Sequence, residues 1–322
     1  METLDFRDIQ PLRDMNNLLE MARLVAQIKG PKKVAVAAAE EAHVIQAVNE
    51  ARMEGLIHPV LFGNPDRVRR IAVELGIKAQ GLDIRPAKNP PEAAELATQL
   101  VSGGEADILM KGMVQSSDFL RAALNRDWGL RAGKLLSHVL IYEAAGFDRL
   151  FMMSDGAMNI NPDLKAKIQI VENAVTMAHI LGVAEPKVAL LAAVEMVNPD
   201  MDTAVEDAII AKMADRGQIK GAVIDGPLAL DNAVSEEAAR IKKIKSPVAG
   251  KADILIVDNI DVGNVFYKSL IYFAHVRAAG IIMGAKAPMI LTSRADPEEV
   301  KFMSLATAVI AAERMQYVRA GG

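Results

Sequence analysis

The chain has 322 residues, of which 51% are hydrophobic and 24% are charged, and its formal net charge is −4. This composition is typical of a globular protein and excludes a disordered chain. The acidic balance argues against nucleic acid or an anionic membrane as a partner. Because single hydrophobic cores seldom grow to this length, we expect two domains.

Cysteine is absent from the sequence, which excludes disulfides, thiolate metal sites and a cysteine nucleophile. The N-terminal stretch METLDFRDIQPL lacks the basic start and the apolar run of a secretion signal. No apolar run approaches the ~18 residues of a membrane span. The sequence therefore predicts a cytoplasmic protein.

Apolar runs alternate with amphipathic segments from the start of the chain to its end. The first expected strands are Lys32–Glu40, His58–Asn64 and Glu105–Gly112, and the helices expected after them are Glu41–Gly55, Pro65–Gly76 and Ser116–Arg126. Further apolar runs follow at 138–144, 149–158, 186–195, 220–230, 252–259 and 280–293. With about ten strands alternating with helices, the pattern favours a two-lobed α/β fold with mainly parallel sheets.

Five loops that directly follow apolar runs are rich in polar and charged groups. They are Lys111–Leu124, Ser154–Asp163, Asp225–Ser235, Asp258–Leu270 and Thr292–Val300. Each loop by itself is adequately explained by turn formers and helix caps. Ligands of open α/β sheets bind beyond the carboxyl ends of the strands, so five such loops together favour a binding site.

One of these loops has the pattern of a phosphate cradle. Gly263 and Asn264 allow close approach of the backbone, and Lys268 follows about one helical turn later. A solvated helix lysine is the alternative for Lys268. The motifs G-x-G-x-x-G, G-x-x-x-x-G-K-[ST] and G-x-S-x-G are absent, and the five histidines lack metal-ligand spacing, so no metal site is expected.

The last third of the chain carries a family resemblance. The segments DGPLALDNAVS, VAGKADILIVDNIDVGNVFYKSL and AGIIMGAKAPMILTSRADPEEVK resemble the phosphate acetyl/butyryltransferase family, and the first and third resemble its butyryltransferase branch in particular. The resemblance covers nearly the whole chain from about Lys32 onward. It implies a fold like that of isocitrate and isopropylmalate dehydrogenases.

The resemblance also implies a reaction and an organisation of the chain. Acyl-CoA and phosphate would give acyl phosphate and free CoA, reversibly, with a short acyl group such as butyryl and without a metal or redox cofactor. One domain, 1–130 plus 286–322, would hold both termini, and 131–285 would form the second. The site would lie in the cleft between them, in a homodimer or larger homo-oligomer.

Functional residues follow from the resemblance position by position. The catalytic serine–arginine pair falls on Ser293 and Arg294. The family's proposed base is an aspartate shortly after this pair, and Glu299 takes its place here, with a different side chain and spacing. The substrate-binding residues are Arg121, Lys111, Asn264, Lys268 and Asp231.

Helix capping explains part of the segment that contains this pair. Asp296 is a good N-cap, Pro297 suits the first helical position and Glu299 completes a capping box. Capping does not explain Ser293 and Arg294. We expect Ser293 to hydrogen-bond the CoA sulfur and Arg294 to bridge phosphate and developing charge, with Glu299 optional as a base.

Alternative functions remain at this stage. The acyl group could be acetyl instead of butyryl, and flexible methionines such as Met110, Met113, Met153 and Met283 are candidate pocket walls. A metal- and NAD-dependent decarboxylating dehydrogenase on the same fold would use acidic residues such as Asp225, Asp231 and Asp258, but it leaves the serine–arginine pair without a role. A non-catalytic acyl-CoA-binding protein is the third alternative.

Overall fold

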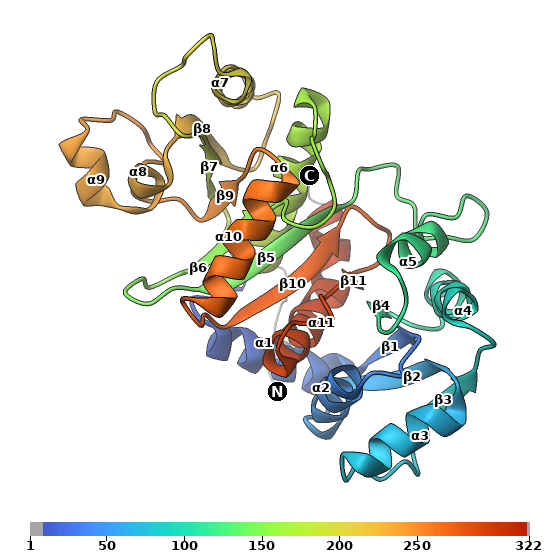
Figure 1. The fold of residues 1–322 in the computed structure, drawn as a ribbon. Coiled ribbons are helices and arrows are strands. Elements are labelled where there is room, and N and C mark those ends of the chain that lie inside the picture. Colours follow the sequence, from blue (N-terminus) through green and yellow to red (C-terminus); the bar gives the residue numbers. More distant parts are fainter. Residues whose placement is uncertain (1–8, 321–322) are drawn as a thin grey trace. The chain divides into compact units, whose positions relative to one another are not determined.

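The structure, a computed structural model, describes residues 9–320 and contains two compact units. Unit 1 comprises residues 9–15 and Leu135–Val276, and unit 2 comprises Asn16–Lys134 and Arg277–Ala320. Each unit has a mainly parallel β-sheet with helices packed on it, which confirms the predicted α/β class (Figure 1). Among the helices of the described residues, none has the length and apolarity needed to cross a lipid bilayer.

Unit 2 has six strands in the order β3-β2-β1-β4-β11-β10. The strands are β1 (Lys32–Ala37), β2 (Ile57–Gly63), β3 (Asp83–Pro86), β4 (Ile108–Lys111), β10 (Ala278–Met283) and β11 (Met289–Ile290). The helices are α1 (Met15–Lys29, which begins at the last residue of unit 1), α2 (Ala42–Met53), α3 (Pro65–Glu74), α4 (Pro90–Ser102), α5 (Ser116–Ala123) and α11 (Glu298–Ala320). All neighbouring strands are parallel except β10 and β11.

One expected strand is divided in the structure. The apolar run 280–293 forms the antiparallel pair β10 and β11, which are joined by a turn. Gly284 has φ +94° at the start of this turn, a conformation that favours glycine, and Pro288 follows before β11. The turn reverses the chain, so that β11 runs parallel to β4 and the residues after it reach the edge at which β4 ends.

Unit 1 has five strands in the order β5-β6-β9-β7-β8. The strands are β5 (Ser137–Glu143), β6 (Leu150–Ser154), β7 (Lys187–Leu191), β8 (Val223–Leu228) and β9 (Ile254–Ile256). The helices are α6 (Leu164–Ile180), α7 (Asp202–Asp215), α8 (Leu230–Val234), α9 (Glu236–Ile241) and α10 (Ile260–Tyr272). β5 and β6 are antiparallel and the other neighbours are parallel, so the loops after β6, β7, β8 and β9 leave the sheet at one edge.

Residues 9–15 are held by the middle of the chain. Leu12 N donates to Leu181 O at 3.0 Å, and Met15 N donates to the Glu143 carboxylate at 2.9 Å. These bonds group the first described residues with unit 1, whereas the sequence placed them with the first domain. The units divide after Lys134 and after Val276. The sequence placed the two domain boundaries after residues 130 and 285. The predicted binding cleft between the domains stays a prediction.

A close backbone approach joins two loops of unit 2. Gly112, directly after β4, donates its N–H to Ala37 O at 2.8 Å, and Met113 N donates to Ala38 O at 2.6 Å. A Cβ atom on Gly112 would lie 2.2 Å from Ala38 O, so a glycine is required there. The loops after β1 and β4 are therefore in direct contact at the carboxyl edge of the sheet.

We expect Gly112→Ala to lower the free energy of unfolding by about 1–3 kcal/mol, because the added methyl group must push two loops apart. Thermal and urea denaturation measure the change. Gly103→Ala is the matched control, since Gly103 has φ −74° and its nearest backbone oxygen would lie 3.1 Å from the new Cβ. A Gly112→Ala protein as stable as the wild type would contradict the required close approach.

Candidate active site

Three parallel strand ends meet at the carboxyl edge of unit 2. β1, β4 and β11 are neighbours, and the chain leaves them through residues 38–41, 112–115 and 291–297. Glu41, Ser293 and Arg294 lie in these segments, and Lys111 is the last residue of β4. The structure therefore brings three of the predicted site residues, Lys111, Ser293 and Arg294, to one edge of one sheet.

The segment after β11 folds into a tight turn around Arg294. Ser293 N donates to the Asp296 carboxylate at 2.6 Å, and Asp296 N donates back to Ser293 O at 3.2 Å. Ala295 N donates to Ser293 Oγ at 3.3 Å. The Ser293 hydroxyl accepts this bond and keeps its proton for another acceptor. Ser293 and Arg294 are exposed, whereas Asp296 is buried.

The charges at this edge favour an anion. Lys111 is 6% exposed, and its ammonium donates to Gly112 O at 3.2 Å. Burial lowers the pKa of Lys111; the charge of Glu41 opposes this shift, and the charges of Arg294 and Lys301 add to it. Among the described residues the Arg294 guanidinium has no hydrogen-bond or ion-pair partner. A guanidinium beside a buried ammonium suits a phosphate group.

Glu299 belongs to a different contact. Its Oε1 accepts from Arg277 Nε at 2.7 Å, and Arg277 Nη1 donates to Asn16 Oδ1 at 2.9 Å. This chain of contacts ties the first turn of α11 to α1 and to the residue before β10. It gives Glu299 a structural function, and its role as a base stays a prediction.

Arg121 lies on α5, which follows β4 by a short loop. Its guanidinium donates to the Asp118 carboxylate at 2.8 Å, one turn earlier in the same helix, and its side chain is 75% exposed. Within the described part of the chain, Arg121 makes no hydrogen bond or ion pair with Lys111, Ser293 or Arg294. An exposed ion pair of this kind contributes little to stability, so Arg121 is available to a ligand.

The predicted residues of unit 1 lie on α10 and α8. Asn259 caps α10, accepting from Asp261 N and Val262 N at 3.1 Å each. Gly263 packs on the loop after β6, where a Cβ would lie 2.5 Å from Asp155 O. Asn264 Nδ2 donates to Gly156 O at 3.4 Å in the same contact.

Asn264 and Lys268 are four residues apart on α10 and therefore lie on one face of the helix. The Lys268 ammonium is 4.7 Å from the centre of the Tyr267 ring. The structure thus brings Asn264 and Lys268 together on a fixed helix next to the loop after β6. Their contact with a substrate stays a prediction.

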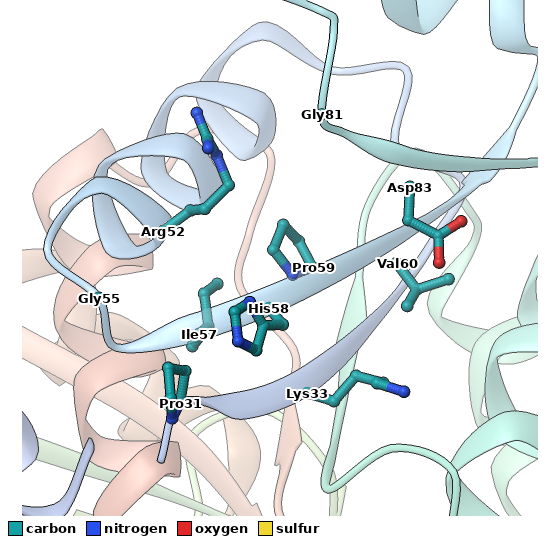
Figure 2. Close-up of a pocket in the computed structure, with 10 residues that line it drawn as sticks. All are labelled: Pro31, Lys33, Arg52, Gly55, Ile57, His58, Pro59, Val60, Gly81 and Asp83. Atoms are coloured by element: carbon teal, nitrogen blue, oxygen red, sulfur yellow. The ribbon is translucent and has the colours of Figure 1, made fainter. Parts of the chain in front are cut away.

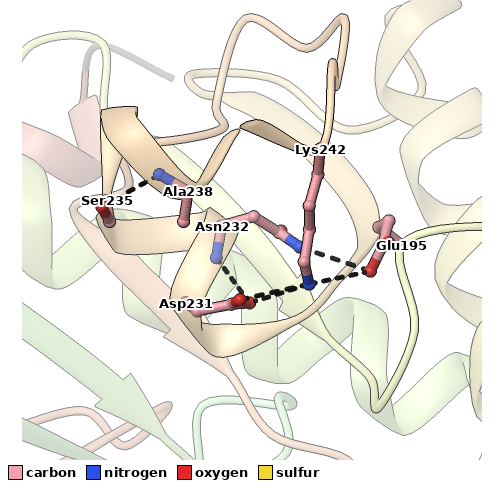
Figure 3. A network of polar contacts seen from close by, with 6 residues as sticks. All are labelled: Glu195, Asp231, Asn232, Ser235, Ala238 and Lys242. Atoms are coloured by element: carbon pink, nitrogen blue, oxygen red, sulfur yellow. Dashed lines mark hydrogen bonds and ion pairs between the residues drawn. The ribbon is translucent and has the colours of Figure 1, made fainter. Parts of the chain in front are cut away.

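Asp231 forms part of a network that Figure 3 shows. Its carboxylate pairs with the Lys242 ammonium at 3.1 Å, and Lys242 also donates to Glu195 at 3.3 Å. Asn232 Nδ2 lies 3.5 Å from the same Glu195 oxygen. The hydrogen bond from Lys242 lowers the pKa of Asp231. The network ties α8, the end of α9 and the loop after β7 together, which gives Asp231 a structural function; substrate binding by Asp231 stays a prediction.

Sequence reasoning missed a buried ionic cluster that precedes α10. Lys167 is 4% exposed and bonds to Asp258, next to the cap residue Asn259, and to Glu206 at 2.6 Å. Burial acts to lower the pKa of Lys167, but its bonds to Asp258 and Glu206 outweigh burial and raise it. The charge of Asp258 was visible in its loop, whereas Lys167 resembled an ordinary helix lysine in the sequence.

Asp207 on α7 completes this cluster. It is 4% exposed, and its Oδ2 has no hydrogen-bond partner among the described residues. Burial raises the pKa of Asp207 to about 7, with Lys167 opposing the shift and Asp258 and Glu206 adding to it. Asp207 is therefore a neutral acid below neutral pH and becomes a buried anion as the pH rises.

A cavity of about 320 Å³ in unit 2 lies away from these groups. It is lined by the amino ends of β1 and β2, including Lys33 and His58, and by Arg52 at the end of α2. Figure 2 shows that the Arg52 side chain points away from Lys33 and His58. Because the strands are parallel, this cavity lies at the sheet edge opposite to Lys111. Within residues 9–320 no cluster of three or more His, Asp or Glu residues could hold a metal ion.

The raised pKa of Asp207 gives a pH-dependent stability. The folded pKa lies above the unfolded one, so the group's contribution is favourable at low pH and is lost as the pH rises from about 4 to 7. Asp207→Asn removes the ionisable group. We expect the difference in melting temperature, variant minus wild type, to increase from pH 5 to pH 8, because only the wild type loses stability over this range. The shift of the pKa corresponds to an upper limit of about 4 kcal/mol. Asp215→Asn, at an exposed position on α7, should show no such trend.

Comparisons with known proteins place this chain in a family. Residues 90–311 match the family model described as phosphate acetyl/butaryl transferase. The chain is 48% identical over 284 residues to the phosphate butyryltransferase of Clostridium acetobutylicum, which covers 88% of this chain and 94% of that protein. It is 46% identical over 296 residues to the phosphate acetyltransferase of Thermotoga maritima, covering 92% of this chain and 99% of that protein.

Solved structures agree with this match. The crystal structure of a branched-chain phosphotransacylase from Enterococcus faecalis has a TM-score of 0.77 and 35% identity, and covers 87% of this chain and 99% of that one. A 4-hydroxythreonine-4-phosphate dehydrogenase from Burkholderia phymatum shares the fold, with a TM-score of 0.51, 13% identity, and coverage of 87% of this chain and 98% of that one. The chain belongs to the phosphate acetyl/butyryl transferase family, as the motifs of its last third predicted.

Proposed function

We propose that this protein transfers a short acyl group between CoA and inorganic phosphate, giving acyl phosphate and free CoA in a reversible reaction. Membership of the family supports this reaction. The observation that carries the proposal is the exposed Ser293–Arg294 turn beside the buried ammonium of Lys111, because a hydroxyl and two cations are what an anionic acyl acceptor requires.

We assign the steps of the reaction to these groups. Arg294 and Lys111 hold phosphate, whose oxygen attacks the thioester carbonyl carbon. The carbon–sulfur bond breaks, and CoA leaves as a thiolate that afterwards takes up a proton. The Ser293 hydroxyl donates to the sulfur and stabilises the departing charge. In the reverse direction a free thiol with a pKa near 8.5 needs about 2 kcal/mol to ionise fully near pH 7, which a close guanidinium and hydroxyl supply.

A direct attack in a ternary complex suits this chain, because cysteine is absent from the sequence and the sequence shows no strong serine–histidine arrangement. Glu299 is optional in this scheme, since its carboxylate already binds Arg277 at 2.7 Å. Arg121, Asn264, Lys268 and Asp231 remain predicted substrate contacts. The absence of a cofactor requirement remains part of the proposal.

The acyl group is proposed to be butyryl or a similar short chain. The relatives that support a short acyl group are a phosphate butyryltransferase, a phosphate acetyltransferase and a branched-chain phosphotransacylase. Of the four methionines considered as pocket walls, Met110, Met153 and Met283 are at most 2% exposed, whereas Met113 is 37% exposed and follows Lys111 closely. Met113 is therefore the methionine best able to contact the acyl chain.

The decarboxylating dehydrogenase considered as an alternative from the sequence has no observation in its favour. The likeness to a dehydrogenase at 13% identity concerns the fold alone. Asp231 is paired with Lys242 and Asp258 with Lys167, which leaves both carboxylates poorly suited to a divalent cation. The homodimer or larger homo-oligomer and the cytoplasmic location stay proposals, and light scattering measures the first.

Phosphate-dependent release of free thiol from acyl-CoA tests the function directly. We expect turnover with butyryl-CoA to require phosphate and to proceed without added metal or NAD. Rates with acetyl-, propionyl-, butyryl- and isobutyryl-CoA at fixed phosphate measure the acyl preference. A rate that does not depend on phosphate contradicts the proposed reaction, and magnesium-dependent NADH formation from a hydroxy acid would establish the alternative.

Three single variants test the assigned roles. We expect Arg294→Ala to lower kcat/KM by about 10²–10³-fold and Ser293→Ala by about 10–10²-fold, because both remove groups that stabilise developing charge. Glu299→Gln should lose less than about 10-fold, since its ion pair is structural. If Glu299→Gln abolishes turnover while the other two stay near wild type, the electrostatic account is wrong and Glu299 is the base.

A further inference from the structure

Lys301 is a buried cation that the proposed reaction does not use. It lies in the first turn of α11, its side chain is 1% exposed, and it is among the largest fully buried side chains of the described chain. Lysine is seldom buried completely, because its ammonium loses its hydration unless acceptors surround it. The contacts of this ammonium therefore indicate what the burial serves.

The Lys301 ammonium binds the turn that carries the Ser293–Arg294 pair. It donates to Ser293 O at 3.1 Å and to Asp296 O at 2.9 Å, and it pairs with Glu41 Oε1 at 3.7 Å. The two carbonyl oxygens lie on either side of Arg294 along the chain. Glu41 comes from the loop after β1, so one side chain joins α11, the loop after β1 and the turn after β11.

This contact restrains a segment that has little regular structure of its own. β11 contains two residues, Met289 and Ile290, and the chain from 291 to 297 lies outside any helix or strand. Within the turn the Asp296 carboxylate binds Ser293 N. The Lys301 ammonium adds two charge-assisted bonds to main-chain atoms, which are stronger than neutral ones and are shielded from water.

We propose that Lys301 is a positioning residue, which fixes the 293–296 turn so that the Ser293 hydroxyl and the Arg294 guanidinium face the substrates in a reactive arrangement. This inference rests on the proposed function. A displacement of about 1 Å in a reacting group can cost about 10²-fold in rate, so loss of the two bonds should appear mainly in kcat. Lys301 touches neither substrate, and its effect passes through the turn.

Lys301→Met is the test variant, since methionine keeps an unbranched apolar chain and removes the ammonium. We expect it to lower kcat by about 30–100-fold, with the KM for acyl-CoA changed less than about threefold. Lys32→Met is the matched control. Lys32 is a half-buried lysine at the start of β1. It pairs at 2.8 Å with Glu313 of α11, the helix that also contains Lys301, and lies far from the turn. We expect it to lower the melting temperature and leave kcat within about twofold.

A double-variant comparison separates positioning from general destabilisation. In an Arg294→Ala background, Lys301→Met should cost several-fold less than in the wild type, because one of the two groups that it positions is already absent. An equal loss in both backgrounds, or a Lys301→Met enzyme with wild-type kcat, overturns the inference. If Lys301→Met does not fold, Lys301→Gln replaces it under the same comparison, because its amide can still donate to one carbonyl.

Different results overturn the proposed function and the role of Lys301. A wild-type protein that releases no thiol from butyryl-CoA with phosphate overturns the proposed function. A wild-type protein that turns over normally, combined with additive losses in the double variant, overturns the role of Lys301 alone. Circular dichroism and melting curves at the assay temperature confirm that each variant is folded before its rate is compared.

Discussion

The parallel alignment of β1, β4 and β11 is the constraint on which the candidate site depends. Parallel neighbours end at one edge of a sheet, so the three segments that follow them must share a small volume. Gly112 presses the loop after β4 onto the loop after β1, and no side chain fits between them. The backbone geometry of the sheet therefore brings Glu41, Lys111 and the turn at Arg294 close together, and no side-chain contact is needed for this.

Among the described residues, three buried lysines are compensated in three ways. Lys167 is neutralised by the carboxylates of Asp258 and Glu206, and Lys301 by main-chain oxygens together with Glu41. Lys111 has a single carbonyl contact; burial and the charges of Arg294 and Lys301 lower its pKa, and the charges of Glu41 and Asp296 oppose this shift only in part. Because the pKa of Lys111 is lowered, an anion such as phosphate beside it would favour its charged form.

Much of the fold and part of the site could be predicted from the sequence. Continuous apolar strands and amphipathic helices predicted the α/β class, and three segments in the last third of the chain predicted the family, because these signals are local in the sequence. Lys301 could not be found in this way, since "EEVKF" reads as an exposed helix start. The partner of Glu299, Arg277, lies 22 residues earlier, and only the folded chain brings the two together.

The bond between Lys301 and Ser293 spans eight residues, and this span sets a fixed length for the chain between β11 and α11. One added residue would carry the carbonyl oxygens past the reach of the ammonium while leaving the sheet and the helix intact. Loops at active sites usually tolerate changes of length better than the elements around them. In this segment we expect the residue count to be constrained as well as the side chains of Ser293, Arg294 and Asp296, so a search for proteins with the same site should compare the spacing to Lys301 together with the sequence.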